Sequence, residues 1–131
     1  MVRRAIWHEL GGFDEGFFPL WFEDVDFCRR LLDRGYRLCY TPIAVAKHTG
    51  GHSISKMAVE KRRVYWYGSL LRYSARHLGP IAFRTVCLAV VAGSIPRMIF
   101  ESAAGGSLKP MATYGKVVRL AARYFWRGPQ L

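Results

Sequence analysis

Residues 22–35 read FEDVDFCRRLLDRG and carry the clearest helical pattern in the chain. Apolar residues recur there at intervals of three and four, as in a helix that packs on one face: Val25, Cys28 and Leu32. Acids at the start complement the helix dipole, and Gly35 can take the left-handed conformation that ends many helices. The pattern predicts a helix that begins within the first three residues of the stretch and ends just before Gly35. We expect Asp26 to pair with Arg30 on its outer side.

Beyond this helix the apolar period changes to two, which is typical of strands. Residues 36–40 and 43–47 alternate in this way and predict two short strands. Three helical patterns follow, separated by glycine and proline, at about 55–77, 81–104 and 111–126. Pro96 lies inside the second pattern and is expected to kink or stop that helix. We therefore expect an α/β domain over residues 1–53 and a helical, cationic tail over residues 54–131.

The charge of the chain is uneven. The formal net charge is +11, but residues 1–33 carry four Arg against seven acids, a net charge of −3, and residues 34–131 carry +14. A composition that is 51% hydrophobic and 15% aromatic excludes disorder throughout. The basic part is suited to polyanions, which include nucleic acid, anionic lipid headgroups and phosphorylated small molecules. Charge alone does not choose among these partners.

The cysteines and the apolar stretches bear on the cellular compartment. Cys28, Cys39 and Cys87 match neither a zinc spacing nor a disulfide framework, which favours a reducing compartment. No secretory signal is visible, because charged residues occur throughout the first twenty positions. The longest stretch without Lys, Arg, Asp or Glu, residues 85–96, is shorter than the roughly 20 residues that a membrane-spanning helix needs. We predict no spanning helix, although the basic tail is suited to a membrane surface.

The densest group of candidate functional residues is Glu23 and Asp24 beside Trp21. Acids in the first turn of a helix often serve only to complement its dipole. A carboxylate pair next to an aromatic ring also suits general base catalysis. His48 stands at the end of a predicted strand before two glycines, where a ligand can approach the backbone. A structural role for this histidine stays open.

The cluster Lys61-Arg62-Arg63 followed by Tyr65-Trp66-Tyr67 raises the question of nucleic-acid binding. On a helix the three aromatic rings would point in three directions rather than form one stacking surface. The pattern therefore favours a helix with a packed side and a solvated charged side, and nucleic acid is an unlikely partner.

Several of these motifs resemble the family 2 glycosyltransferases, specifically the C-terminal half of the GT-A catalytic domain in rhamnosyltransferase-like members. The motifs are GGFDE at residues 11–15, EDVD at 23–26 and HTGGHS at 48–53. Each motif alone is weak, and their order and spacing make the combination specific. The resemblance covers roughly residues 2–77.

The resemblance implies an inverting transfer of a sugar from a nucleotide-sugar donor to a hydroxyl group. It makes Asp24 the catalytic base and places Glu23 and Trp21 on the acceptor side. Inversion follows from direct displacement with one base and no covalent intermediate. The implied acceptor is lipid-linked or a polysaccharide, as in the synthesis of cell-surface polysaccharides or glycolipids.

The same resemblance assigns the leaving-group side of the site. It implies that His48 helps to hold a divalent metal, Mg²⁺ or Mn²⁺, on the departing diphosphate. His52 and Ser53 are further groups that could contact this diphosphate. We expect Asp24 and His48 to converge on a shared cleft.

The chain departs from the family pattern in one respect. It has no Asp-x-Asp motif outside residues 24–26 and no glycine-rich strand-to-helix unit for a nucleotide. We therefore expect a truncated reading frame or one piece of a split enzyme, and little or no transferase activity from the isolated chain. The expected location is cytoplasmic, on the inner face of the plasma membrane. The alternative is a noncatalytic basic module that binds a membrane surface or nucleic acid. A metal hydrolase built on His48 and His52 has too few recognisable ligands.

Overall fold

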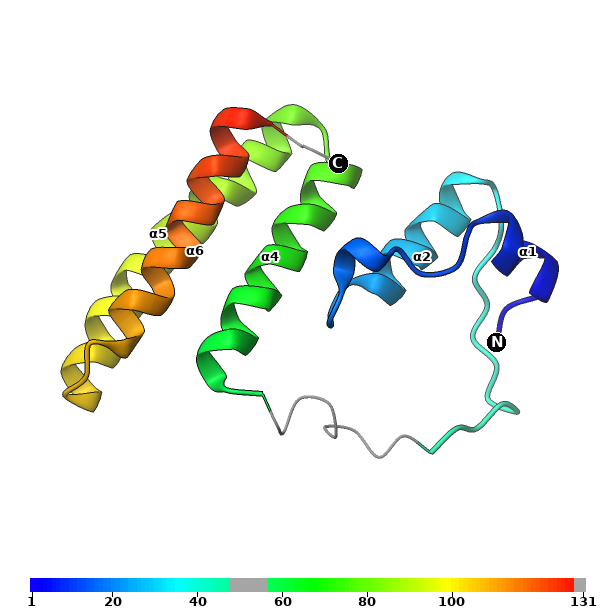
Figure 1. Cartoon of the computed structure of the whole chain (residues 1–131). Helices are drawn as coiled ribbons and strands as arrows, with labels where there is room; N and C mark the ends of the chain where they lie inside the picture. The colour runs from blue at the N-terminus through cyan, green and yellow to red at the C-terminus, as the bar shows by residue number, and fades with distance from the viewer. Residues whose placement is uncertain (48–56, 129–131) are drawn as a thin grey trace. The chain divides into compact units, whose positions relative to one another are not determined.

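The computed structural model describes residues 1–47 and 57–128, and this part of the chain is built from helices and irregular segments (Figure 1). The chain divides into two compact units, Met1–Lys56 (unit 1) and Met57–Leu131 (unit 2). The predicted α/β class, with a Rossmann-like GT-A half, is wrong, because the described residues include helices but no strand.

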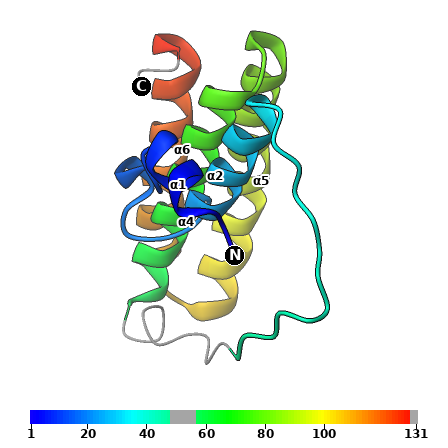
Figure 2. The ribbon, with the colours of Figure 1, turned by 90° about the vertical axis from the view of Figure 1, so that its right-hand side faces the viewer.

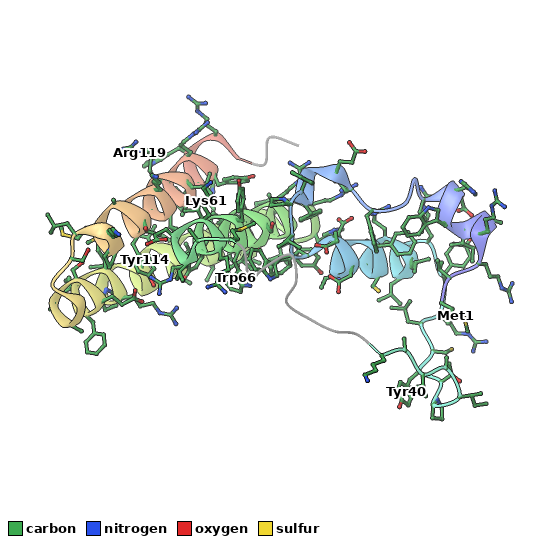
Figure 3. The ribbon with its side chains drawn as sticks, turned by 60° about the horizontal axis from the view of Figure 1, so that its bottom comes forward. Met1, Tyr40, Lys61, Trp66, Tyr114 and Arg119 are labelled. Atoms are coloured by element: carbon green, nitrogen blue, oxygen red, sulfur yellow. The ribbon has the colours of Figure 1, made fainter. Side chains whose placement is uncertain are left out.

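The two predicted strands, residues 36–40 and 43–47, have no regular secondary structure. Their apolar side chains are exposed, with Tyr40 and Ile43 each at 92% and Val45 at 90% (Figure 3 labels Tyr40). A strand exists only when its backbone groups bond to a neighbouring strand, whereas alternation records a local preference. The preference is present in this segment, but the described residues supply no pairing strand.

The described residues of unit 1, 1–47, form two helices and a short 3-10 helix. Helix α1 covers Arg4–Glu9, the 3-10 helix η1 covers Glu15–Phe17 and helix α2 covers Glu23–Asp33. The prediction for α2 is confirmed at both ends, and Gly35 follows it with a left-handed φ of 79°. The sequence therefore identified the helix that carries the candidate base.

An aromatic cluster joins α1 to α2 in unit 1. The ring of Trp7 lies 5.0 Å from that of Phe13 and 5.1 Å from that of Phe27, between centroids. Phe13 and Phe27 are 5.7 Å apart and meet edge to face, an arrangement that aromatic rings favour. The cluster fixes the loop after α1 against one face of α2.

Unit 2 consists of three long helices that run side by side (Figure 1). Helix α4 covers Val59–His77, α5 covers Pro80–Gly105 and α6 covers Lys109–Arg127. Figure 2 shows the same three helices from the side. The helices predicted for this region are confirmed, and the predicted glycine break is too, because α5 ends at Gly105 and Gly106 is left-handed.

All three helices contribute to the core of unit 2. Its buried members are apolar or small: Leu71, Ala75, Phe83, Cys87, Val90, Val117 and Ala121. Burial raises the pKa of the Cys87 thiol. The core is continuous along the bundle, and burial of apolar surface is its main source of stability.

A polar cluster links the three helices at one side of this core. Arg63 of α4 forms an ion pair with Glu101 of α5, and the hydroxyl of Tyr114 of α6 donates to Glu101 Oε1 at 2.9 Å. The Arg63 guanidinium lies 5.3 Å from the centroid of the Tyr114 ring. Burial favours the neutral form of Glu101, but the hydrogen bonds from Arg63 and Tyr114 outweigh it and lower the Glu101 pKa.

Helix α5 differs from its prediction in two ways. It continues through Pro96, which lies on the exposed side, where the loss of one backbone hydrogen bond is compensated by solvent. Among the described residues it is also the one helix long and apolar enough to cross a membrane by length and composition. The length expected from the uncharged stretch was too short, because α5 extends past the arginines at both of its ends. The prediction that no helix spans a membrane stays a prediction.

Candidate functional site

The loop that leads to the candidate site depends on a close contact at Gly12. Gly11 and Gly12 both have left-handed φ values, 71° and 69°. A Cβ atom added at Gly12 would lie 2.8 Å from Cζ2 of Trp7, which is closer than real Cβ contacts allow. Gly12 is therefore needed for its backbone conformation and for the approach of the indole ring.

Arg30 clamps this loop onto α2. Its Nε donates to Oδ2 of Asp26 at 2.7 Å, while Nη1 and Nη2 donate to the backbone carbonyls of Leu10 and Gly12 at 2.6 and 2.7 Å. The predicted pair of Asp26 and Arg30 is confirmed, but its predicted position on the outer side is wrong, because Asp26 is fully buried. The loop covers this face of the helix, and the guanidinium satisfies both the carboxylate and two carbonyl groups.

The backbone is strained immediately before α2. Trp21 and Phe22 have φ values of 75° and 71°, in a region that non-glycine residues rarely adopt. Each such residue costs about 1–3 kcal/mol, and such strain clusters at functional sites. The carbonyl of Phe22 accepts from the amide of Asp26 at 2.8 Å, so the strained pair leads directly into the first turn of the helix. No sequence pattern had indicated this backbone strain.

Asp24, the predicted base, is exposed and lines an open cavity of about 720 Å³ in unit 1. Its Oδ1 accepts from the amide of Val25 at 2.8 Å. The cavity has aromatic and aliphatic walls, two thiols and two cationic side chains: Ile6, Trp7, Phe13, Phe27, Leu31, Leu38, Cys28, Cys39, Arg3 and Arg37. A carboxylate on such a cavity is accessible to a ligand with both polar and apolar parts.

Glu23, predicted for the acceptor side, lines a different and smaller cavity of about 180 Å³ beside η1. Its Oε2 is buried and has no hydrogen-bond partner among the described residues. Trp21 is half-buried and lines neither cavity. Trp21, Glu23 and Asp24 are neighbours in the sequence. The structure nevertheless places the carboxylates of Glu23 and Asp24 on the walls of two different cavities.

The other predicted site residues, His48, His52 and Ser53, lie outside the described residues. The convergence of Asp24 and His48 stays a prediction for that reason. The described residues contain no group of three or more His, Cys, Asp or Glu that could hold a metal ion. Those residues alone do not fit a divalent metal, so the metal also stays a prediction.

Sequence reasoning missed the polar contacts that hold the rim of the large cavity. The hydroxyl of Tyr36, a lining residue, donates to Oε2 of Glu9 at 2.7 Å, and Arg34 pairs with Oε1 of the same carboxylate at 3.2 Å. The hydrogen bond to Glu9 raises the pKa of the Tyr36 phenol. These partners are 25 and 27 residues apart, a separation that local periodicity does not reveal.

Comparisons with known proteins give several partial similarities. No protein-family model and no solved structure matches the chain. The chain is 32% identical over 99 residues to the N-acetylglucosaminyl-diphospho-decaprenol L-rhamnosyltransferase of Mycobacterium tuberculosis. The matched region covers 65% of this chain and 31% of that protein. It is 32% identical over 106 residues to the pre-mycofactocin glycosyltransferase of the same species, with 81% of this chain and 21% of that protein covered.

A third relative comes from another organism. Rhamnosyltransferase WbbL of Escherichia coli K12 is 36% identical over 76 residues, which covers 58% of this chain and 28% of that protein. The chain therefore spans about a fifth to a third of the length of these curated relatives. At this level the predicted resemblance is confirmed, and the chain is a relative of rhamnosyltransferases and other glycosyltransferases.

Proposed function

We propose that this chain is part of a glycosyltransferase that moves a sugar, with inversion, from a nucleotide-sugar to a hydroxyl group of a lipid-linked acceptor. The observation that carries the proposal is the similarity to three named glycosyltransferases together with Asp24 on the wall of an open cavity. One relative is named for an acceptor in which a sugar is joined through a diphosphate to decaprenol. The proposal extends the same acceptor class to this protein.

In the proposed reaction Asp24 acts as the base. A sugar hydroxyl is a weak nucleophile, and its oxygen attacks the anomeric carbon as its proton passes to the carboxylate. The bond from that carbon to the nucleoside diphosphate breaks in the same step, and the diphosphate leaves with the electron pair. A single base and a direct displacement invert the anomeric carbon.

The cavity has groups that suit the proposed acceptor. Arg3 and Arg37 line it with Asp24, and guanidinium groups bind phosphate oxygens in charge-assisted hydrogen bonds. The aromatic wall at Trp7 and Phe13 suits the apolar face of a sugar or the first part of a lipid chain. The acceptor would therefore have its diphosphate near the arginines and its hydroxyl near the carboxylate.

The partly buried clamp at Arg30 has a positioning role in this proposal. Arg30 fixes the loop of Leu10 and Gly12 to α2, the helix that carries Asp24. The strained residues Trp21 and Phe22 fix the start of the same helix. Catalytic groups need to be held to within a fraction of an ångström, and two separate constraints on one helical turn provide such support.

A chimera tests the role of Asp24, because the chain matches only a part of its relatives. This chain replaces the matching part of the mycobacterial rhamnosyltransferase, and sugar transfer to that enzyme's own acceptor is measured. We expect Asp24→Asn to lower kcat by about 10²- to 10⁴-fold, the usual contribution of a general base. The matched control is Asp33→Asn, which changes an exposed carboxylate of the same helix and should leave kcat within about twofold.

Two results would contradict the proposal. If Asp24→Asn and Asp33→Asn have equal kcat values, Asp24 is not the base. If the folded chimera with Asp24 in place transfers no sugar, the chain does not supply a working part of such an enzyme. The anomeric configuration of the product, measured by NMR, tests inversion separately. The isolated 131-residue chain should show little or no transfer.

A further inference from the structure

Helix α5 has a second apolar face that the protein leaves uncovered. Ile81, Leu88, Ile95 and Ile99 are 84, 58, 45 and 62% exposed, and their spacings of seven, seven and four place them on one side of the helix. We call these four residues the outer stripe. The core residues of α5 lie on the opposite side: Phe83, Cys87 and Val90.

The four residues of the outer stripe are uncharged, and so are three of their neighbours on this side of the helix: Thr85, Ala92 and Pro96. This side also carries one exposed cation. Arg84 lies beside the stripe, and its guanidinium is 5.8 Å from the centroid of the Phe125 ring of α6. Large exposed apolar patches on a folded unit mark sites of interaction. We therefore expect the outer stripe to contact an apolar partner.

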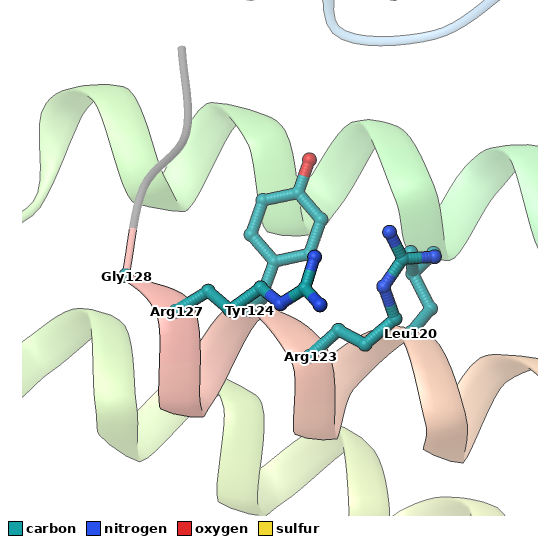
Figure 4. Close-up of a pocket in the computed structure, with 5 residues that line it drawn as sticks. All are labelled: Leu120, Arg123, Tyr124, Arg127 and Gly128. Atoms are coloured by element: carbon teal, nitrogen blue, oxygen red, sulfur yellow. The ribbon is translucent and has the colours of Figure 1, made fainter.

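The charge of unit 2 calls for an anionic partner. Residues 57–131 carry twelve Lys and Arg against two acids, a net charge of +10. On α6 the exposed cations Lys109, Lys116 and Arg123 recur at intervals of seven and lie on one side of the helix. Arg123 and Arg127 line a hollow of about 250 Å³ with Tyr124, as Figure 4 shows. No described acid pairs with either arginine of this hollow.

One kind of partner satisfies both features. A nucleic acid would neutralise the cations but leave the outer stripe in water. A second copy of the chain would cover the stripe but would bring together two units of charge +10. An anionic lipid bilayer offers hydrocarbon to the stripe and phosphate groups to the cations.

The packing of α5 decides how it would meet a bilayer. Its inner side is packed against α4 and α6, and Glu101 is tied to Arg63 and Tyr114 of those helices. A spanning α5 would have to leave these helices or take their charged side chains into the hydrocarbon, and both are costly. We propose that the outer stripe lies in the interface of an anionic bilayer, with α5 parallel to the membrane plane. This inference does not rest on the proposed transferase activity.

Vesicle flotation of the whole 131-residue chain tests the inference. We expect binding to vesicles that contain phosphatidylglycerol and much weaker binding to vesicles of phosphatidylcholine alone. Leu88→Gln with Ile99→Gln should lower the partition coefficient about tenfold or more, because two apolar side chains leave the hydrocarbon boundary. The matched control, Ile43→Gln with Val45→Gln, changes two side chains that are 92% and 90% exposed in unit 1 and should leave binding unchanged.

Each other outcome overturns the inference. Equal vesicle binding by the stripe variant and the control, at equal helicity by circular dichroism, would show that the cations alone bind the vesicles and that the outer stripe does not contribute. Retention of the chain in vesicles after an alkaline carbonate wash would show that α5 spans the membrane. Dimers that dissociate in the stripe variant, without vesicle binding by the unsubstituted chain, would assign the stripe to a second copy. An oligonucleotide that displaces the vesicles, and that binds the stripe variant as well as the unsubstituted chain, would assign the surface to nucleic acid.

Discussion

Unit 1 and unit 2 are both built from helices, but different forces hold them together. Unit 1 is almost neutral, with eight Lys and Arg against seven acids over residues 1–56, and an aromatic cluster and a partly buried arginine hold its loop to α2. Unit 2 carries +10 and has a continuous apolar core with its polar cluster at the side. The directional contacts of the arginine clamp add to apolar packing in unit 1 and suit the positioning of functional groups, whereas the nondirectional core of unit 2 tolerates surface change.

The backbone supports the same comparison. The two non-glycine residues with left-handed φ in the described chain, Trp21 and Phe22, both belong to unit 1 and directly precede α2, the helix of the candidate base. The helices of unit 2 continue even through Pro96. Strain is therefore concentrated next to the proposed chemistry, and unit 2 is regular where we propose a membrane contact.

Loss of the Arg30 clamp should have the largest effect on stability. Arg30→Met removes the cation that pairs with the buried Asp26 carboxylate and the donors to two carbonyl groups, which should cost about 3–5 kcal/mol. The control Arg29→Met removes an exposed pair with Asp33 on the same helix and should cost less than about 1 kcal/mol. Native-state hydrogen exchange of the α2 amides measures both values. Equal costs for the two variants would mean that polar contacts do not distinguish unit 1.

Gly12→Ala should have an intermediate effect. The new Cβ would meet Trp7 at 2.8 Å in a backbone of positive φ, and we expect a cost of about 2 kcal/mol. Gly11→Ala is the control, because it has a similar φ of 71° but no atom within 4 Å of its Cβ. The difference between the two variants isolates the contact with the indole. Identical values would show that backbone conformation alone explains both glycines.

Disruption of the polar cluster of unit 2 should have the smallest effect on the free energy of unfolding. This effect should depend on pH. The Glu101 pKa is lowered in the folded state, so its stabilisation is present above the unfolded-state value of about 4.3 and is lost as the pH falls through the folded-state pKa. Glu101→Gln should cost about 1 kcal/mol at pH 7, with a smaller loss between pH 5 and pH 3 than in the unsubstituted chain. Native-state hydrogen exchange of the α6 amides at several pH values measures the stability of both proteins. If the stability of Glu101→Gln falls between pH 5 and pH 3 as much as that of the unsubstituted chain, Glu101 is not the source of the pH dependence.

Local sequence patterns predicted the helices well but failed for the strands. The helix of residues 22–35 and the three helices of unit 2 follow from periodicity and from glycine and proline breaks, which act within a few residues. Residues 36–47 have the alternation of a strand, but strand formation depends on a partner that a local pattern does not contain. The error in fold class comes from this one difference.

The site was predicted in part. The acids of the EDVD motif and the resemblance to glycosyltransferases pointed to Asp24, and the structure places it on an open cavity. The remaining cavity walls, Arg3, Trp7 and Arg37 among them, lie within the stretch that the resemblance covers, but the resemblance assigned them no role in the site. Their part in the site depends on the way the chain folds back after α1.

By itself the sequence determined α2, α4, α5 and α6, the uneven charge, the pairing of Asp26 with Arg30 and the relationship to glycosyltransferases, but it did not indicate α1. These depend on residue types and on separations of a few positions. Only the tertiary structure decided that Asp26 is buried, that Glu23 and Asp24 line separate cavities and that the outer stripe of α5 faces outward. Burial and exposure depend on which distant segments cover a face, and nonlocal packing decides that.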